Sequence, residues 1–171
     1  MKNFNTGWYL IYTRPRHEKK LAVSLSESEV HNFLPTVSRL RNWNDRRRFV
    51  DTPLFPSYIF VYVKSMEEYF KALTMQGALY YVRSGKEVAR IDESIICNIR
   101  LIAQQGEEVE VSDGVFKSGQ QLVVQQGPLT GLNCEVVRYC GKEKLLVRVY
   151  LLQRNLLLNV PAGHLTAAQA C

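Results

Sequence analysis

The sequence predicts an α+β protein, in which an N-terminal α/β sandwich with a mainly antiparallel sheet flanked by helices precedes a small C-terminal β-barrel. One observation is the strand expected within residues 53–63, which carries apolar or aromatic side chains on both faces and therefore needs cover on both. Another is the helical spacing of apolar residues on either side of this strand. The third is the succession of short apolar runs and turn residues after residue 116, which is typical of a small closed barrel.

Signals at element ends define the N-terminal unit. Pro15 suits the first turn of a helix, and Ser65 with Glu68 forms a capping box. Asp92 is a favourable N-cap for a helix whose isoleucines repeat at helical spacing. The expected elements are strands at 8–12, 33–40, 53–63 and 79–83, helices at 15–28, 65–73 and from 92, and a polar hairpin tip at 41–48.

The segment at 53–63 carries the most information. Pro53 and Pro56 cannot donate inside a ladder, so they mark the strand's entrance and leave Phe55 near the rim of the sheet, where we expect it to be exposed. Side chains alternate along a strand. We expect one row to be buried under helices, Ile59, Val61 and Val63, while the aromatic row opposite is open to either interpretation, Tyr58, Phe60 and Tyr62.

Composition predicts two domains joined by a linker. Residues 1–104 form the first domain, residues 105–115 an acidic flexible linker, and residues 116–171 the barrel. The barrel is short, so its core is modest and its stability is expected to be marginal.

The composition also limits the class of protein. With 171 residues, of which 46% are hydrophobic and 22% charged, and without a signal peptide or membrane span, we expect a cytoplasmic monomer that does not contact membranes. The four cysteines show no Cys-x-x-Cys spacing and the three histidines lie far apart, so neither a metal nor another cofactor is expected. No pattern of clustered carboxylates or nucleophile with base points to an enzyme.

Basic residues are concentrated in two short stretches, while residues 92–114 are acidic. Such asymmetry is typical of proteins with a polyanionic partner. In the second stretch, arginines surround a tryptophan on which an unpaired base could stack. Either stretch could instead be a solvated charged face. The candidate nucleic-acid-binding residues are Arg14, Arg16, Lys19 and Lys20 in the first stretch, and Arg39, Arg41, Trp43, Arg46, Arg47 and Arg48 in the second.

The turn at residues 127–131, between apolar strands, resembles the motif of the KOW domain. The similarity covers Val123 to Val137, with Gly127, Pro128 and Gly131 as the motif residues. Cys134 stands where that family usually has a glycine.

Residues 8–12, the basic helix after them and above all LFPSYIFVYV at 54–63 resemble the NusG N-terminal domain. The two resemblances together span nearly the whole chain in the order of the NusG and RfaH family. General members usually carry glycine where this chain has Ser57, and Pro-Leu-Phe precedes as in the specialised branch. The resemblance therefore favours an antiterminator of specific operons, such as polysaccharide or capsule clusters, over a general elongation factor.

The resemblance implies contacts as well. Tyr12, Phe55 and Phe60 match positions that dock on the clamp helices of RNA polymerase, and the alternative is that all three belong to the core. The interface is favoured for Tyr12 and Phe55, while Phe60 is open to either interpretation. Tyr150 and Leu151 lie where relatives contact a small-subunit ribosomal protein or the termination factor Rho, or else in the barrel core. Non-template DNA or nascent RNA is the implied partner of the basic stretches.

The sequence favours one of three classes of function. A non-catalytic factor that binds RNA polymerase and promotes processive elongation or antitermination is favoured. The alternatives are a KOW-type RNA- or ribosome-binding protein without a polymerase role, and an enzyme acting on nucleic acid, which lacks candidate chemistry.

Overall fold

The computed structural model describes residues 5–43, 46–104, 109–112, 119–124, 132–139, 142–149, 152, 154–158 and 165–167. The chain divides into two compact units, residues 1–36 with 53–96 and residues 37–52 with 97–171. The finer division expected at residues 104 and 115 stays a prediction.

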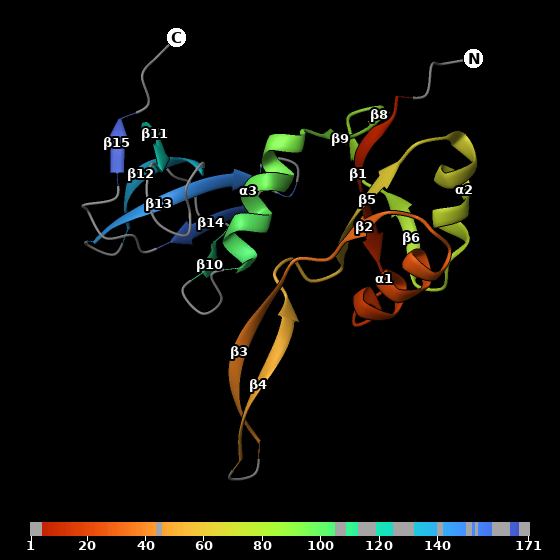
Figure 1. Ribbon diagram of the computed structural model, residues 1–171, viewed down its shortest axis with the longest axis horizontal. Coiled ribbons are helices and arrows are strands. Elements are labelled where there is room, and N and C mark those ends of the chain that lie inside the picture. The colour runs from red at the N-terminus through yellow and green to blue at the C-terminus, as the bar shows by residue number, and fades with distance from the viewer. Residues whose placement is uncertain are drawn as a thin grey trace. The chain divides into compact units, whose positions relative to one another are not determined.

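The first unit is built on an antiparallel sheet with the strand order β2-β5-β1-β6 (Figure 1). A further short strand, β9, pairs with β1 beside β6. Beyond β6, strands β7 and β8 form a separate two-stranded hairpin. The bounds are Gly7–Thr13 for β1, Asn32–Phe33 for β2, Tyr58–Val63 for β5, Ala78–Tyr81 for β6, Arg83–Ser84 for β7, Glu87–Val88 for β8 and Arg90–Ile91 for β9.

Three helices are found in the described chain, α1 at Glu18–Glu27, α2 at Met66–Thr74 and α3 at Glu93–Gln104. The capping prediction for α2 is confirmed, because Ser65 Oγ accepts the Glu68 N–H at 3.2 Å. The prediction that Pro15 opens α1 is wrong. Arg16 adopts a left-handed backbone with φ of 65°, which interrupts a right-handed helix, so α1 begins only after His17.

One face of the sheet packs against α1 and α2 (Figure 1). Its buried side chains form a single cluster with leucines of α1, and the predicted burial of the aliphatic row of β5 is confirmed. The cluster contains Tyr9, Ile11, Leu21, Leu25, Val30, Ile59, Val61, Val63, Ala72 and Tyr81.

The segment between β2 and β5 differs from the expectation. A single strand at 33–40 was predicted, but Leu34 and Pro35 separate β2 from β3, which spans Thr36–Trp43. Strand β4, Arg46–Pro53, pairs with β3 in a two-stranded ribbon (Figure 1). The expected tip at 41–48 is therefore mostly strand. The hydrophobic pattern does not reveal these two strands, because a ribbon with solvent on both sides does not need alternating apolar residues.

The described strands that follow α3 form an antiparallel sheet ordered β10-β14-β13-β12-β11-β15. Because this order ends on two different strands, the described residues make an open sheet, and the closed barrel that was expected is not seen. Val137, Leu146 and Leu157 pack together on it. No helix in the described ranges is both long and apolar enough for a membrane span. The bounds are Val109–Ser112 for β10, Gln120–Val124 for β11, Asn133–Tyr139 for β12, Lys142–Val149 for β13, Arg154–Leu158 for β14 and Leu165–Ala167 for β15.

Candidate functional site

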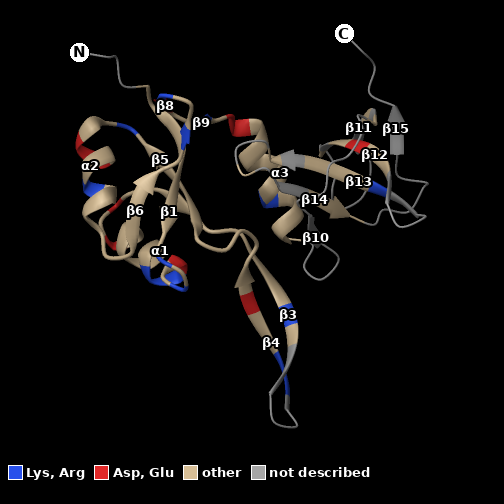
Figure 2. Ribbon diagram, turned by 180° about the vertical axis from the view of Figure 1, so that it is seen from behind, with Lys and Arg blue, Asp and Glu red and all other residues tan. Residues whose placement is uncertain are grey.

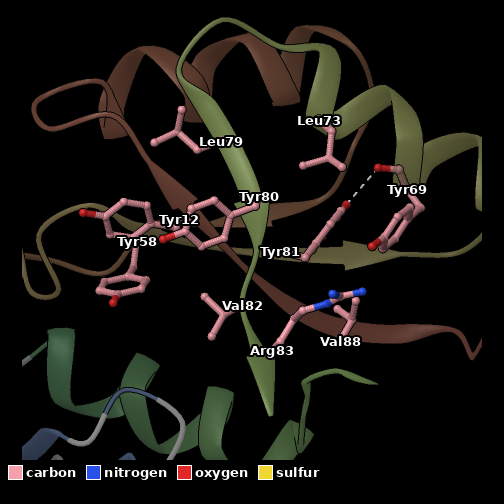
Figure 3. A pocket seen from close by; sticks show the side chains of 10 residues that line it. All are labelled: Tyr12, Tyr58, Tyr69, Leu73, Leu79, Tyr80, Tyr81, Val82, Arg83 and Val88. Carbon is pink, nitrogen blue, oxygen red and sulfur yellow. Dashed lines mark hydrogen bonds between the residues drawn. The ribbon is translucent and has the colours of Figure 1, made fainter. Parts of the chain in front are cut away.

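Three tyrosines lie in register on the sheet face opposite α1 and α2. Tyr12 of β1 pairs with Tyr58 of β5 on one side and with Tyr80 of β6 on the other. The Tyr12 ring stacks on that of Tyr80, with centroids 5.2 Å apart and planes at 21°, and meets the Tyr58 ring edge-on at 5.3 Å (Figure 3). Tyr80 is 55% exposed, while Tyr12 and Tyr58 are half-buried. These three residues are called the tyrosine row.

The tyrosine row forms part of the wall of a cavity of about 610 Å³ at the β6 edge of the sheet (Figure 3). Its walls are aromatic and aliphatic, and Arg83 is the charged residue among those that line it in the described chain. We call it the edge cavity. The lining residues are Tyr12, Tyr58, Tyr69, Leu73, Leu79, Tyr80, Tyr81, Val82, Arg83 and Val88.

The structure separates the three residues expected to form an apolar docking patch. Tyr12 retains partial exposure, but Phe60 is 0% exposed and its ring stacks on Phe33 at 5.9 Å. Phe55 is 3% exposed, so the expectation that it is exposed is wrong. Its ring folds back onto Phe60, with centroids 6.1 Å apart, and ring contact is a favourable way to bury both.

The turn between β4 and β5 explains how Phe55 is turned inward. The Tyr58 N–H donates to the Phe55 carbonyl at 3.2 Å, with Pro56 and Ser57 between them. Ser57 has φ of 66°, a region that favours glycine. Its carbonyl accepts the Thr13 N–H at 2.8 Å, which fixes the turn to the end of β1.

Glu18 holds the same turn from the other side. The Ser57 N–H donates to Glu18 Oε1 at 2.7 Å, and Glu18 is 5% exposed. Glu18 is the acidic residue of the first basic stretch, and this hydrogen bond keeps its carboxylate buried. The charged residues left exposed there are the four predicted cations, Arg14, Arg16, Lys19 and Lys20, near the start of α1 (Figure 2).

The second basic stretch lies along the ribbon of β3 and β4 (Figure 2). Arg39, Arg47 and Arg48 are exposed, together with Phe49 at 61%. Arg41, Trp43 and Arg46 belong to the two strands, but their side chains lie outside the described part of the chain.

The hydroxyl groups of Tyr69 and Tyr81, on the side of the sheet that the helices cover, have a structural role. Tyr69 stacks on Tyr81 at 4.1 Å, and Tyr81 Oη donates to the Tyr69 carbonyl at 3.1 Å. Burial raises the pKa of Tyr81 far above its ordinary value. Burial also raises the pKa of Tyr69, and the nearby Arg83 guanidinium opposes this rise. Both hydroxyls therefore stay protonated at neutral pH.

The motif residues Gly127, Pro128 and Gly131, and the candidate partner residues Tyr150 and Leu151, lie outside the described residues. Cys134 is 3% exposed, and burial, with Glu135 adding to it, raises the pKa of its thiol to about 11. A thiol that stays protonated is unreactive, which fits a structural role. Within the described ranges, no group of three or more His, Cys, Asp or Glu is arranged to hold a metal ion.

Sequence reasoning missed the two outer members of the tyrosine row as site candidates. Tyr58 was placed on the correct face by alternation along β5, but its role was left undecided. Alternation along the strand places Tyr80 and Tyr81 on opposite faces of the sheet, but it does not show which of the two is buried. The pairing of β6 with β1, a long-range contact, decides this.

Comparison with known proteins agrees with this architecture. The family model described as "Transcription termination factor nusG" matches residues 6–100. A structure on domain interaction in Thermotoga maritima NusG aligns with a TM-score of 0.51 at 18% identity, covering 96% of this chain and 98% of that one. An Spt4:Spt5 complex described as MjSpt4:Spt5 aligns at 14% identity with a TM-score of 0.33, covering 94% and 95%.

The first of these structural matches supports the fold, and the family match carries the assignment because it extends over more than half of the chain, from the first strand of the sheet into α3. The chain belongs to the NusG family of transcription factors.

Proposed function

We propose that this protein is a non-catalytic transcription factor that binds RNA polymerase through its N-terminal unit and promotes processive elongation or antitermination. The observation that carries this proposal is the NusG family match over residues 6–100, which contains the whole sheet with its two covering helices. A partner-binding role also suits an aromatic surface that the unit does not cover itself, since tyrosine is enriched at protein interfaces.

We assign the polymerase contact to the open end of the aromatic face, by which we mean the tyrosine row on the sheet face opposite α1 and α2. The implied partner is the clamp helices. Tyr12 makes the direct contact there. Phe55 and Phe60 are buried, so they do not contact the polymerase directly. Their packing stabilises the turn and the strand that carry Tyr58. Truncating either phenylalanine then weakens polymerase binding through misfolding of this end and not through a lost contact.

Nucleic acid is the proposed partner of the two basic stretches, as non-template DNA or nascent RNA next to the polymerase. At the first stretch, support comes from the buried Glu18, because the charged side chains that remain exposed are all cationic, namely Arg14, Arg16, Lys19 and Lys20. At the second, the ribbon presents Arg39, Arg47 and Arg48 to solvent. Each phosphate neutralised adds to the salt dependence of binding.

The specialised branch remains the favoured identity within the family. Ser57 supports it, because general members usually have glycine here and this backbone position has the positive φ that glycine prefers. The C-terminal unit is proposed to be a KOW barrel whose residues Tyr150 and Leu151 recruit a ribosomal protein or Rho.

The test is reconstitution of the full-length protein with purified core RNA polymerase. Co-elution in size-exclusion chromatography, with shorter pauses in single-round transcription, is the expected result. Shortened pauses on every template would indicate a general factor, whereas an effect confined to templates from its own target operons would indicate a specialised one. Failure to co-elute at low salt, with binding to ribosomes instead, would contradict the proposal and favour the KOW-type alternative.

A further inference from the structure

The β3–β4 ribbon exposes apolar side chains as well as arginines. Phe49 is 61% exposed, more than any other large apolar residue in the described chain, and Leu40 is 48% exposed. A two-stranded ribbon is at best marginally stable in water, so apolar side chains on it do not make a core of their own. The two side chains are therefore available to cover a partner.

The register of the ribbon brings Phe49 and Leu40 together. Ser38 Oγ donates to Asp51 Oδ1, so these two residues lie opposite each other on one face. Side chains return to the same face every second residue, which places Leu40 of β3 opposite Phe49 of β4. The same register continues to the tip, where two residues connect the strands.

Arginines flank this apolar pair on both faces of the ribbon (Figure 2). Arg47 is exposed and lies two residues from Phe49 along β4, so it shares the face of the ring. Arg39 and Arg48 are exposed and alternate onto the opposite face. The acid on the face of the ring is Asp51, whose carboxylate is already hydrogen-bonded within the ribbon. The surroundings of the ring are therefore cationic.

The charge around the ring selects the occupant. A second copy of the chain would bring two arginine-rich ribbons together, which like-charge repulsion opposes. A single strand of nucleic acid offers both groups that this surface matches, phosphates for the arginines and unpaired bases for an exposed ring. A base within a duplex is already stacked on its neighbours, so an exposed ring matches an unpaired strand better.

We propose that Phe49 is a stacking platform for an unpaired base of single-stranded nucleic acid, with Leu40 supporting the ring and Arg47 holding an adjacent phosphate. This inference rests on the proposed function, in which the ribbon contacts non-template DNA or nascent RNA, and it names an unpaired strand as the ligand. Phe49 is thereby a stacking residue in addition to the candidate Trp43.

Fluorescence anisotropy of labelled oligothymidylate with the full-length protein, measured across a salt series without polymerase, tests the proposal. Phe49→Ala weakens binding by about tenfold, equivalent to about 1.4 kcal/mol, and leaves the salt slope unchanged, because stacking releases no counterions. Phe49→Trp keeps an aromatic face and binds at least as tightly as the natural protein. Arg47→Met weakens binding and lowers the salt slope by about 0.7. Oligouridylate of the same length, compared with oligothymidylate, shows whether RNA or DNA is preferred.

Matched variants separate stacking from general surface effects. Phe49→Leu keeps an apolar side chain without a ring, so it binds as weakly as Phe49→Ala. Val50, 38% exposed on the other face of the ribbon, and Phe70, 59% exposed on α2, are the apolar controls, and their alanine variants bind within twofold of the natural protein. Lys86→Met, in the exposed turn between β7 and β8, is the charge control. Unchanged thermal unfolding of each variant shows that the fold is intact.

The outcomes that overturn the proposal are distinct. Natural-level binding of oligothymidylate by Phe49→Ala overturns this inference and leaves the proposed function standing. Full recovery of binding in Phe49→Leu indicates an apolar contact without stacking and also overturns it. Tighter binding of the natural protein to a duplex of the same length, or no binding to either single strand at low salt, overturns it as well. Absence of co-elution with polymerase, with binding that still depends on Phe49, overturns the polymerase part of the proposed function alone.

Discussion

The two faces of the sheet in the first unit have similar apolar content but different cover. The face against α1 and α2 is buried throughout, from Tyr9 and Ile11 on β1 to Ile59 and Val61 on β5. The opposite face is graded. Leu10 and Phe60 are fully buried, the pair Tyr12 and Tyr58 is half-buried, and Tyr80 at the edge is more than half exposed.

This difference shows where the protein's own packing ends. A face covered completely by helices is a core, and its side chains contribute to stability. A face whose burial decreases toward one edge leaves aromatic rings without cover, and such rings are the usual material of interfaces. The buried part and the open part of the aromatic face are expected to respond differently to substitution.

The largest expected effect is at the buried part. Phe60→Ala removes a fully buried ring that contacts Phe33 and Phe55, so the free energy of unfolding of the first unit falls by about 3–5 kcal/mol. Phe70→Ala on the exposed side of α2 changes it by less than about 1 kcal/mol. Equal small losses in urea unfolding would show that the aromatic face is not a core.

The next effect concerns the support of the turn. Glu18→Ala leaves the Ser57 N–H without its acceptor in a partly buried site, at a cost of about 1–3 kcal/mol. Glu18→Gln keeps an acceptor oxygen and loses less. Glu27→Ala, an exposed acid at the other end of α1, is the control and stays within about 0.5 kcal/mol. A loss at Glu27 as large as that at Glu18 would contradict the role given to this carboxylate.

The smallest effect has the opposite sign. Ser57→Gly relieves a positive φ that an L side chain rarely adopts, and we expect a gain of about 0.5–1 kcal/mol in the free energy of unfolding. Ser24→Gly, within α1, loses about 0.5 kcal/mol, because helical φ offers glycine no advantage. A loss at Ser57 in chemical denaturation would mean that its side chain stabilises the turn by more than the backbone strain costs.

Much of the first unit could be predicted from sequence because its signals are local. Alternation placed β5 and its two faces correctly, and the Ser65 cap located the start of α2. The start of α1 was predicted too early, because nothing in the sequence indicates that Arg16 adopts a left-handed backbone conformation. The length of the β3–β4 ribbon was underestimated, because its arginines are typical of a polar turn, whereas the strands extend into this arginine-rich segment.

The site was harder to predict because exposure depends on long-range packing. Phe55 lies between Pro53 and Pro56 at the entrance of the strand and was expected at the rim, yet the turn folds its ring onto Phe60. Tyr80 was not singled out, although its stacking on Tyr12 makes it the exposed end of the row. Which of two adjacent tyrosines faces solvent is decided by the pairing of β6 with β1.

The central claim is that the partner covers the open end of the aromatic face. Hydroxyl-radical footprinting with mass spectrometry, on the full-length protein with and without core RNA polymerase, tests it most directly. Leu79 and Tyr80 should be oxidised in the free protein and protected in the complex, while Met66 and Phe70, exposed on α2, should be oxidised equally in both. Protection of Met66 and Phe70 with Tyr80 still fully reactive would contradict the claim.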